Sequence, residues 1–77
     1  MPRYYFDTHD GDRLVRDNDG EGLAGLEQAQ TEAVKALPDM ARDALPCGDR
    51  RDFVVSVRDE GGRQVVKATL SLVVELS

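Results

Sequence analysis

Residues 64–76 read QVVKATLSLVVEL, and this stretch determines how the rest of the chain is expected to fold. An apolar residue stands at every second position from Val66 to Leu76, and the residues between them are mostly polar. Such alternation is typical of a β-strand that buries one face. The stretch is about twice the usual length of a strand. We therefore expect the upstream chain to cover its apolar face or to pair with its edges.

The preceding residues 52–63, DFVVSVRDEGGR, predict a strand at 52–59 and a tight turn into this stretch. A two-residue turn at Gly61 and Gly62 keeps the apolar residues of both strands on one side. The predicted pairs are Phe53 with Leu70, Val55 with Ala68, and Val57 with Val66. A three-residue turn without a bulge would place Val55 opposite Lys67 and split the faces. The two-residue turn is therefore favoured.

This register leaves the end of the chain without a partner. The strand at 52–59 is used up near Leu70, so residues 71–76 lie beyond the hairpin. We expect them to pair with the first strand of the chain or with a second chain.

The N-terminus predicts another hairpin. Residues 3–7, RYYFD, form a strand with Tyr4 and Phe6 facing inward, because that face has the larger apolar content. A turn follows at residues 9–12, HDGD, and a short strand at 13–16. A turn at Asp10-Gly11 places Phe6 opposite Val15, whereas a three-residue turn places it opposite Leu14. The sequence leaves both registers open.

A polar loop and one helix connect the hairpins. Residues 17–22, DNDGEG, contain no hydrophobic anchor and predict a surface loop. Residues 26–45 predict a helix with one apolar stripe. The residues of that stripe are Leu26, Ala29, Ala33, Leu37, Met40 and Ala44. Pro38 lies on the opposite arc, so we expect a kinked continuous helix, with two shorter helices as the alternative.

These elements together predict a single α+β domain over residues 1–77. Their order is ββαββ, and we expect a four-stranded, mainly antiparallel sheet with the helix on one face. A chain of this size buries a small core, so self-association is one expected source of added stability.

Composition excludes several classes of function. The net charge is −5, with 15 acidic residues against 10 Lys and Arg, which disfavours nucleic-acid binding. No apolar run is long enough to span a membrane, and the N-terminus lacks the apolar core of a secretory signal. Cys47 is the only cysteine, which excludes an internal disulfide and agrees with a reducing cytoplasm.

The sequence predicts no catalytic, metal or cofactor site. An acidic run could suggest calcium, and it comprises Asp7, Asp10, Asp12, Asp17, Asp19 and Glu21. Aligning it with an EF-hand loop on Gly20 puts Val15 and Leu26 at the first and last ligand positions, so the pattern fails. His9 is the only histidine and is expected to be exposed in its turn. Cys47 has no base nearby in sequence, so it is interpreted as a bystander thiol.

The remaining candidate is the sheet face that the helix leaves open. It is predicted to carry Tyr5, Val54, Val65 and Val73 among Arg58, Lys67, Thr69, Ser71 and Glu75. This face is either exposed to solvent, with the few single apolar residues that are normal on a protein surface, or it is an interface for another chain. The predicted interface residues are Tyr5, Val54, Val65, Ser71, Val73 and Glu75.

Three stretches resemble a family of small uncharacterised proteins common in rhizobia and related α-proteobacteria. They are PRYYFDTHDGD at the start, LEQAQTEAVKAL in the middle and DRRDFVVSVRDEGGRQVVKATLSLVVE towards the end. The resemblance spans nearly the whole chain and implies no activity. Gly25 and Pro38 depart from it, where an acidic residue and alanine are expected. The layout is also loosely similar to small HicB-type antitoxin domains, an analogy of fold alone.

We therefore expect a non-enzymatic protein-interaction or homo-oligomerisation module of the bacterial cytoplasm that forms a dimer. The alternative is a regulatory or antitoxin-like domain that binds an unlike partner or a small ligand.

Overall fold

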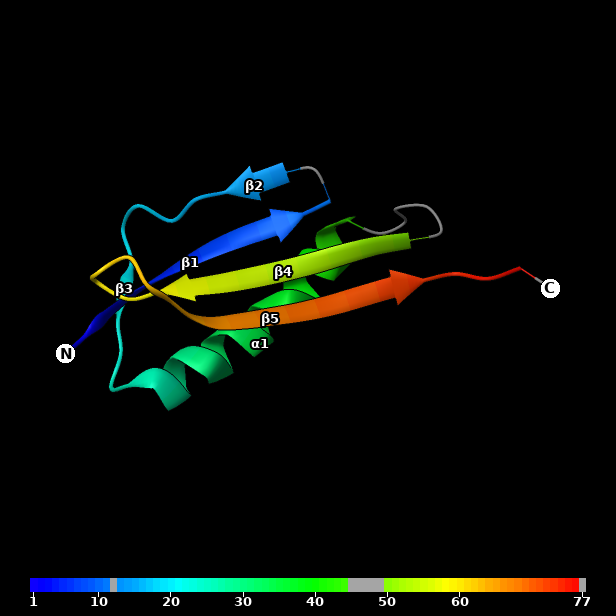
Figure 1. Cartoon of the computed structure of the whole chain (residues 1–77). Helices are drawn as coiled ribbons and strands as arrows, with labels where there is room; N and C mark the ends of the chain where they lie inside the picture. The colour runs from blue at the N-terminus through cyan, green and yellow to red at the C-terminus, as the bar shows by residue number, and fades with distance from the viewer. Residues whose placement is uncertain (12, 45–49, 77) are drawn as a thin grey trace.

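The computed structural model describes residues 1–11, 13–44 and 50–76, and its elements run in the order β1-β2-β3-α1-β4-β5 (Figure 1). The strands are β1 (Arg3–Asp10), β2 (Arg13–Val15), β3 (Glu21–Gly22), β4 (Arg50–Arg58) and β5 (Gln64–Val73), and the helix is α1 (Leu26–Ala44). All strand pairs are antiparallel. The expected α+β fold with one helix packed on the sheet is confirmed.

The sheet has five strands rather than four. Its order is β2-β1-β4-β5, and β3 pairs with β1 as well. The expected surface loop at residues 17–22 contains β3, in which Glu21 pairs with Tyr4 and Gly22 with Arg3. Two residues are too short to leave an alternating pattern, which is why the sequence does not reveal this strand.

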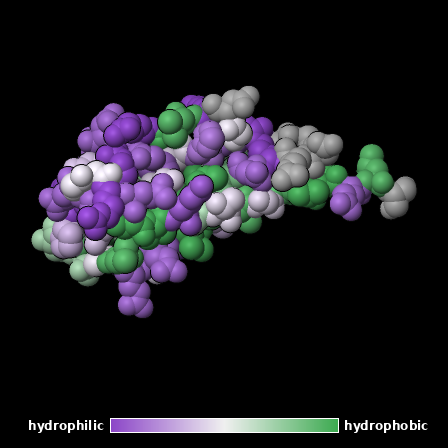
Figure 2. All heavy atoms as spheres, viewed as in Figure 1, coloured by the Kyte–Doolittle hydropathy of each residue, from purple (hydrophilic) through white to green (hydrophobic). Residues whose placement is uncertain are grey.

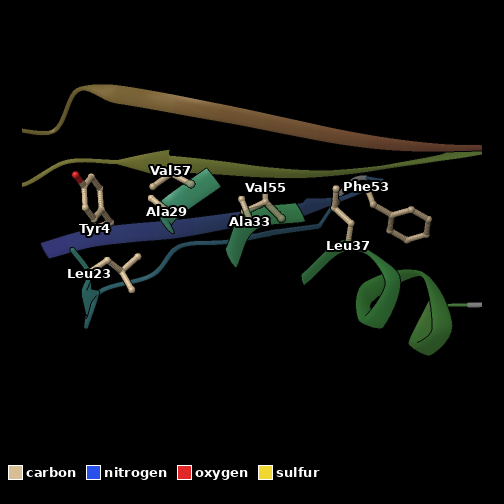
Figure 3. Close-up of a cluster of buried hydrophobic side chains, with 8 residues drawn as sticks. All are labelled: Tyr4, Leu23, Ala29, Ala33, Leu37, Phe53, Val55 and Val57. Atoms are coloured by element: carbon tan, nitrogen blue, oxygen red, sulfur yellow. The ribbon is translucent and has the colours of Figure 1, made fainter. Parts of the chain in front are cut away.

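The core lies between α1 and the middle of the sheet (Figure 3). Phe53, Val55 and Val57 of β4 are fully buried and face α1. Ala29 and Ala33 are also fully buried, because alanine lets the helix approach the sheet closely. Tyr4 is buried and Phe6 packs against the core, so the inward face predicted for the first strand is confirmed.

The helix matches its predicted span and stripe with one exception at its start. Leu37 is buried and Met40 packs against the core, whereas Leu26 is half exposed at the first helical position. The side chain of Ala44 lies outside the described residues. The carboxamide Oε1 of Gln28 accepts a hydrogen bond from the Ala24 amide (2.8 Å), which closes the helix start in the manner of a capping box. Pro38 lies inside one continuous helix, so the alternative of two helices is wrong.

The hairpin of β4 and β5 has the predicted pairs but a different turn. Phe53 pairs with Leu70, Val55 with Ala68, and Val57 with Val66, as predicted. The Asp59 amide donates to the carbonyl of Arg63 (2.9 Å), so the loop has three residues rather than two, and Gly62 is left-handed with φ 85°. The register then shifts by one residue between Val57 and Arg58, which leaves Val65 as a bulge. The bulge restores the pairing that the sequence predicted with a simpler turn.

Both registers considered for the first hairpin are wrong. Thr8 pairs with Val15 and Asp10 with Arg13, so β1 is three residues longer than expected. Gly11 follows with a left-handed φ of 61°. Leu14 and Val15 are both apolar, so their pattern carries no information about register.

Fewer residues extend beyond the β4–β5 hairpin than predicted. β4 begins at Arg50 rather than Asp52, and it pairs with β5 as far as Val73. The strand beside β4 on its other side is β1, in the register that pairs Tyr5 with Arg58 and Asp10 with Phe53. The expectation that residues 71–76 pair with the first strand is therefore wrong, and β5 is an edge strand.

Candidate functional site

The face of the sheet opposite α1 contains most of the predicted interface residues, but they are spread over both ends of the sheet and do not form one patch. Tyr5 lies beside Arg58, at the end of the sheet where β5 begins. Ser71 and Val73 lie at the other end, opposite Asp52 and Arg50. Val54 lies between His9 and Thr69, and Glu75 follows the end of β5.

Val65 does not belong to this face. It packs against the core beside Val66, because the bulge turns two successive side chains of β5 towards α1. The prediction that Val65 faces outward is wrong, since it assumed strict alternation through the turn.

The end of this face near Tyr5 carries a polar cluster, which we call the Arg58 cluster: Tyr5, Asp7, Asp17 and Arg58. The Nε of Arg58 donates to Oδ2 of Asp7 (2.7 Å), and one terminal nitrogen reaches Oδ1 of Asp7 (3.2 Å) and the backbone carbonyl of Asp17 (2.8 Å). The guanidinium carbon lies 4.9 Å from the centre of the Tyr5 ring, so Arg58 also makes a cation–π contact. Both charged side chains of the pair are largely buried, at 19% and 15% exposure.

The Asp17 side chain holds the loop before β3 against the side of β1 that faces away from β4. Its Oδ2 accepts from the Phe6 amide (3.0 Å), and its Oδ1 accepts from the amides of Asp19 (3.0 Å) and Gly20 (3.1 Å). The Asp17 amide in turn donates to Oδ1 of Asp7 (2.9 Å). A side-chain carboxylate thus takes the place of a neighbouring strand between β2 and β3.

Gly20 is required where this loop meets Tyr5. Its φ is 73°, a conformation that residues with a side chain rarely adopt. A Cβ at this position would lie 2.7 Å from Cε1 of Tyr5 and 2.9 Å from Cγ of Arg3. The terminal nitrogen of Arg3 donates to the carbonyl of Asp19 (2.7 Å), which closes the loop on the other side.

The electrostatics of the cluster favour its charged forms. The hydrogen bonds from Arg58 lower the pKa of Asp7, although partial burial opposes them. Partial burial acts to raise the pKa of Asp17, but three backbone amides outweigh it and the pKa is lowered. The pairing with Asp7 raises the pKa of Arg58. Asp7, Asp17 and Arg58 are therefore all charged at neutral pH.

The acidic residues that could suggest a cation site have other partners. Asp7 holds Arg58, Asp17 holds three amides, and Oδ1 of Asp10 accepts from Nε of Arg51 (2.5 Å). Across the described ranges, no three His, Cys, Asp or Glu residues are grouped as metal ligands. His9 is exposed as expected, whereas Asp12 and Cys47 lie outside the described residues.

Two shallow hollows flank these groups. One of about 410 Å³ lies beside the Arg58 cluster and is lined by Tyr5, Arg58, residues 16–18 and the turn at residues 59–62. Another of about 200 Å³ lies between α1 and the first hairpin, where Met40 and Asp43 face Thr8 and Arg13. The arrangement of the Arg58 cluster suits it to anchoring a loop, because its polar atoms already hold one another.

The outer edge of β5 is the second candidate site. Leu70, Val73 and Val74 are 39%, 55% and 47% exposed along this edge. On α1, Leu26 and Val34 are 50% and 52% exposed. Met40 and Asp43 face β1 and β2, so the helical repeat puts Val34 on the opposite flank of α1, towards β5. Leu26 belongs to the same stripe as Met40 and is exposed because it lies in the first turn, where α1 extends beyond β5 (Figure 1).

These exposed residues form one side of the molecule. Figure 2 shows hydrophobic atoms gathered where α1 and β5 lie in Figure 1 and along the chain that follows β5, whereas the end near β3 is mostly hydrophilic. We call this side the β5 edge: Leu26, Val34, Leu70, Val73, Val74 and Leu76. The sequence indicated an unpartnered segment here, but it could not show the contribution of α1.

Comparison with known proteins identifies the family. Within the described residues, no helix is long and apolar enough to cross a membrane. Neither the comparison with curated proteins nor the one with solved structures gave a match. One family model, a domain of unknown function called DUF6894, matches residues 3–71, which run from the first residue of β1 almost to the end of β5. The chain belongs to the DUF6894 family.

Proposed function

We propose that this chain is a non-catalytic self-association module of the cytoplasm, which forms a dimer through the β5 edge. The observation that carries this proposal is the edge strand itself. Among the described residues, Gln64–Val73 pairs with β4 and with no other strand, and the chain that follows it continues in the same direction (Figure 1).

The two edges of the sheet differ in how they are protected. On the β1 side, β2, the Asp17 carboxylate and β3 follow one another along β1 and occupy its outward groups. On the β5 side, the only irregularity is the bulge at Val65, near the start of the strand. Proteins usually blunt long exposed strand edges, because such edges pair with other chains. An edge left open over this length, beside exposed apolar residues, supports a role in association.

The outward backbone groups can be assigned from the sheet. The Gly11 amide donates to the carbonyl of Asp52, so the backbone of Asp52 points towards β1. The backbone groups of successive residues in a strand point to opposite neighbouring strands, so those of Phe53 and Val55 point towards β5. Their partners Leu70 and Ala68 point their backbone groups towards β4. The backbone groups of Lys67, Thr69, Ser71 and Val73 are therefore the ones that face solvent.

This assignment gives a sharp test of self-association. Thr69→Pro removes an outward amide and leaves every bond between β4 and β5 in place. Thr69→Val is the matched control, because it changes the same side chain and keeps the amide. We expect light scattering across a concentration series to show a dimer for the wild type and Thr69→Val, and a monomer for Thr69→Pro with an unchanged circular dichroism spectrum. A wild type that stays monomeric at every concentration would overturn the proposal.

The same edge could instead accept a strand from an unlike protein, in the manner of β-augmentation. That is the structural form of the regulatory or antitoxin-like alternative. It predicts a monomeric wild type that captures a stoichiometric partner, and a loss of that partner in Thr69→Pro but not in Thr69→Val.

A further inference from the structure

We propose that the dimer forms about a two-fold axis at Ser71, with two β5 strands antiparallel and Lys67 opposite Glu75 of the partner subunit. This inference rests on the proposed self-association and adds its register. Three independent features of the chain lead to the same axis.

The first feature is the direction of the free backbone groups. Since the groups of Lys67, Thr69, Ser71 and Val73 face outward, two copies can bond only if outward residues stand opposite outward residues. A two-fold axis must then pass through a residue rather than between two residues. The candidate axes are single positions near the middle of the strand.

The second feature is the length of regular strand. The bulge at Val65 ends regular pairing on one side, and the alternating apolar pattern runs from Val66 to Leu76. A two-fold axis through Ser71 is the midpoint of residues 66–76. It pairs Val66 with Leu76 of the partner subunit and so uses the whole regular stretch. The residues that extend beyond β4 then also gain a partner strand.

The third feature is charge. Lys67 and Glu75 lie four residues on either side of Ser71 and are the only charged residues between positions 66 and 76. With the axis at Ser71 they face each other twice, once on each side of the axis. An axis at Leu70 would place Lys67 opposite Val73, and an axis at Leu72 would place Glu75 opposite Thr69. Opposite charges directly across a strand pair stabilise it, so the axis at Ser71 is favoured.

The same axis covers apolar surface that the single chain leaves open. On the α1 side it pairs Leu70 with Leu72 of the partner subunit and Ala68 with Val74 of the partner subunit. Figure 1 shows α1 crossing the sheet obliquely, with its first turns beyond β5 and its last turns behind β4 and β1. The far end of one β5 is thus brought alongside the β5 start of the other chain, next to the first turns of α1, where Leu26 is exposed, and next to the flank of α1 that carries the exposed Val34. The partner subunit's Val74 and Leu76 would be buried against that flank.

Charge exchange tests the register. Lys67→Glu and Glu75→Lys each set two like-charge pairs across the interface, and we expect each to weaken the dimer about tenfold in dissociation constant. The double variant restores opposite charges and is expected to return to within about twofold of the wild type. Glu60→Lys, in the turn outside the strand, is the matched control and should leave the dissociation constant unchanged.

A cysteine scan gives the position of the axis directly. In a Cys47→Ser background, only a residue on the axis meets its own copy, so Ser71→Cys should form a disulfide-linked dimer on mild oxidation. Thr69→Cys and Val73→Cys place their two copies about 14 Å apart along the strands, too far for a disulfide.

The outcomes separate the two proposals. Cross-linking at position 71 together with rescue by the double charge variant supports the register. A dimer that cross-links at 69 or 73, or whose double charge variant stays weak, overturns the register and leaves self-association standing. A monomeric wild type overturns both.

Discussion

At the scale of single residues, a carboxylate holds the loop between β2 and β3 in place. Asp17 gathers three backbone amides, and Arg58 connects the loop to β1 by reaching Asp7 and the Asp17 carbonyl together. Such anchoring depends on a few atoms in fixed positions, so single substitutions should reveal it.

Gly20 and Gly62 offer a matched pair of substitutions. Both have a positive φ, but a Cβ at Gly20 would meet Tyr5 and Arg3, whereas a Cβ at Gly62 would meet nothing within 4 Å. We expect Gly62→Ala to lower the free energy of unfolding by about 1 kcal/mol, from backbone strain alone. Gly20→Ala should cost clearly more, because the ring of Tyr5 must also move. Urea unfolding of both variants would measure the difference, and equal losses would contradict the close approach at Gly20.

Removing the Asp17 carboxylate should release the loop. We expect Asp17→Ala to lower the free energy of unfolding by about 1–2 kcal/mol, since it leaves three backbone amides to water. Asp19→Ala is the matched control, because Asp19 is exposed and contributes only its backbone to the loop, and its change should stay below about 0.5 kcal/mol. Two equal losses in urea unfolding would show that the side chain of Asp17 does not hold the loop.

Stability should fall in acid, in a direction set by the lowered pKa values of Asp7 and Asp17. A group whose pKa is lower in the folded state stabilises the fold above its unfolded pKa, near 4, and this contribution is lost as the pH falls through the folded value. The free energy of unfolding should therefore decline below about pH 4. Asp7→Asn should be less stable at neutral pH and should decline less in acid. Asp39→Asn, in an exposed helical pair, should keep the wild-type slope.

At the scale of elements, α1 is stabilised by packing more than by its own sequence. Its two fully buried alanines place it close to β4, and its start is closed by a side chain rather than by a strong N-cap. Pro38 sits on the exposed side and removes one backbone donor, yet the helix continues past it. Packing against β4 and β5 outweighs this local defect.

Pro38→Ala should therefore stabilise the protein. The substitution restores a helical hydrogen bond to the carbonyl of Val34 and removes the clash of the ring with the preceding turn. We expect a gain of about 1 kcal/mol, seen as a higher melting temperature by circular dichroism at one fixed protein concentration. Gln30→Ala is a control for helix propensity on an exposed position. A lower melting temperature in Pro38→Ala would show that a bend at Pro38 is needed for the packing of α1.

At the scale of the whole molecule, the protein is a thin sheet with one covered face and one open edge. On the outer side of β1, the strand β2, the Asp17 carboxylate and the strand β3 occupy the backbone groups. The strand β5 instead continues into residues 74–76, in which Val74 and Leu76 are exposed. Pairing of two such edges would join two five-stranded sheets into one and would place a helix from each chain on the same side.

Association of this kind should couple stability to concentration. A partner that binds only the folded chain raises its apparent stability by mass action. We expect the melting temperature of the wild type to rise with protein concentration, and that of Thr69→Pro to stay constant. Calorimetry over a concentration series would measure both, and a wild type that melts at one temperature throughout would count against the dimer.

Much of the fold could be predicted because its signals are local. The alternation in residues 64–76 and the apolar content of residues 52–59 set the pairs of Phe53, Val55 and Val57 correctly. The spacing of apolar residues predicted the span of the helix and most of its buried residues correctly. The pattern predicts a first hairpin near Gly11, but the turn begins one residue later than expected, because Asp10 ends β1 and pairs with Arg13. The register could not be predicted, since two adjacent apolar residues satisfy either face.

The sequence by itself determined every element except β3, the order of those elements, and most of the inward faces of β1, β4 and β5, because periodicity depends only on a residue and its near neighbours along the chain. The tertiary structure alone decided that β4 lies between β1 and β5, which brings Asp7 to Arg58 across 51 positions and leaves β5 at the edge. It also decided that Val65 turns inward at a bulge and that Leu26 and Val34 of α1 remain exposed. These features depend on which strands pair and how the helix crosses them, and that is settled by the packing of the core rather than by any local pattern.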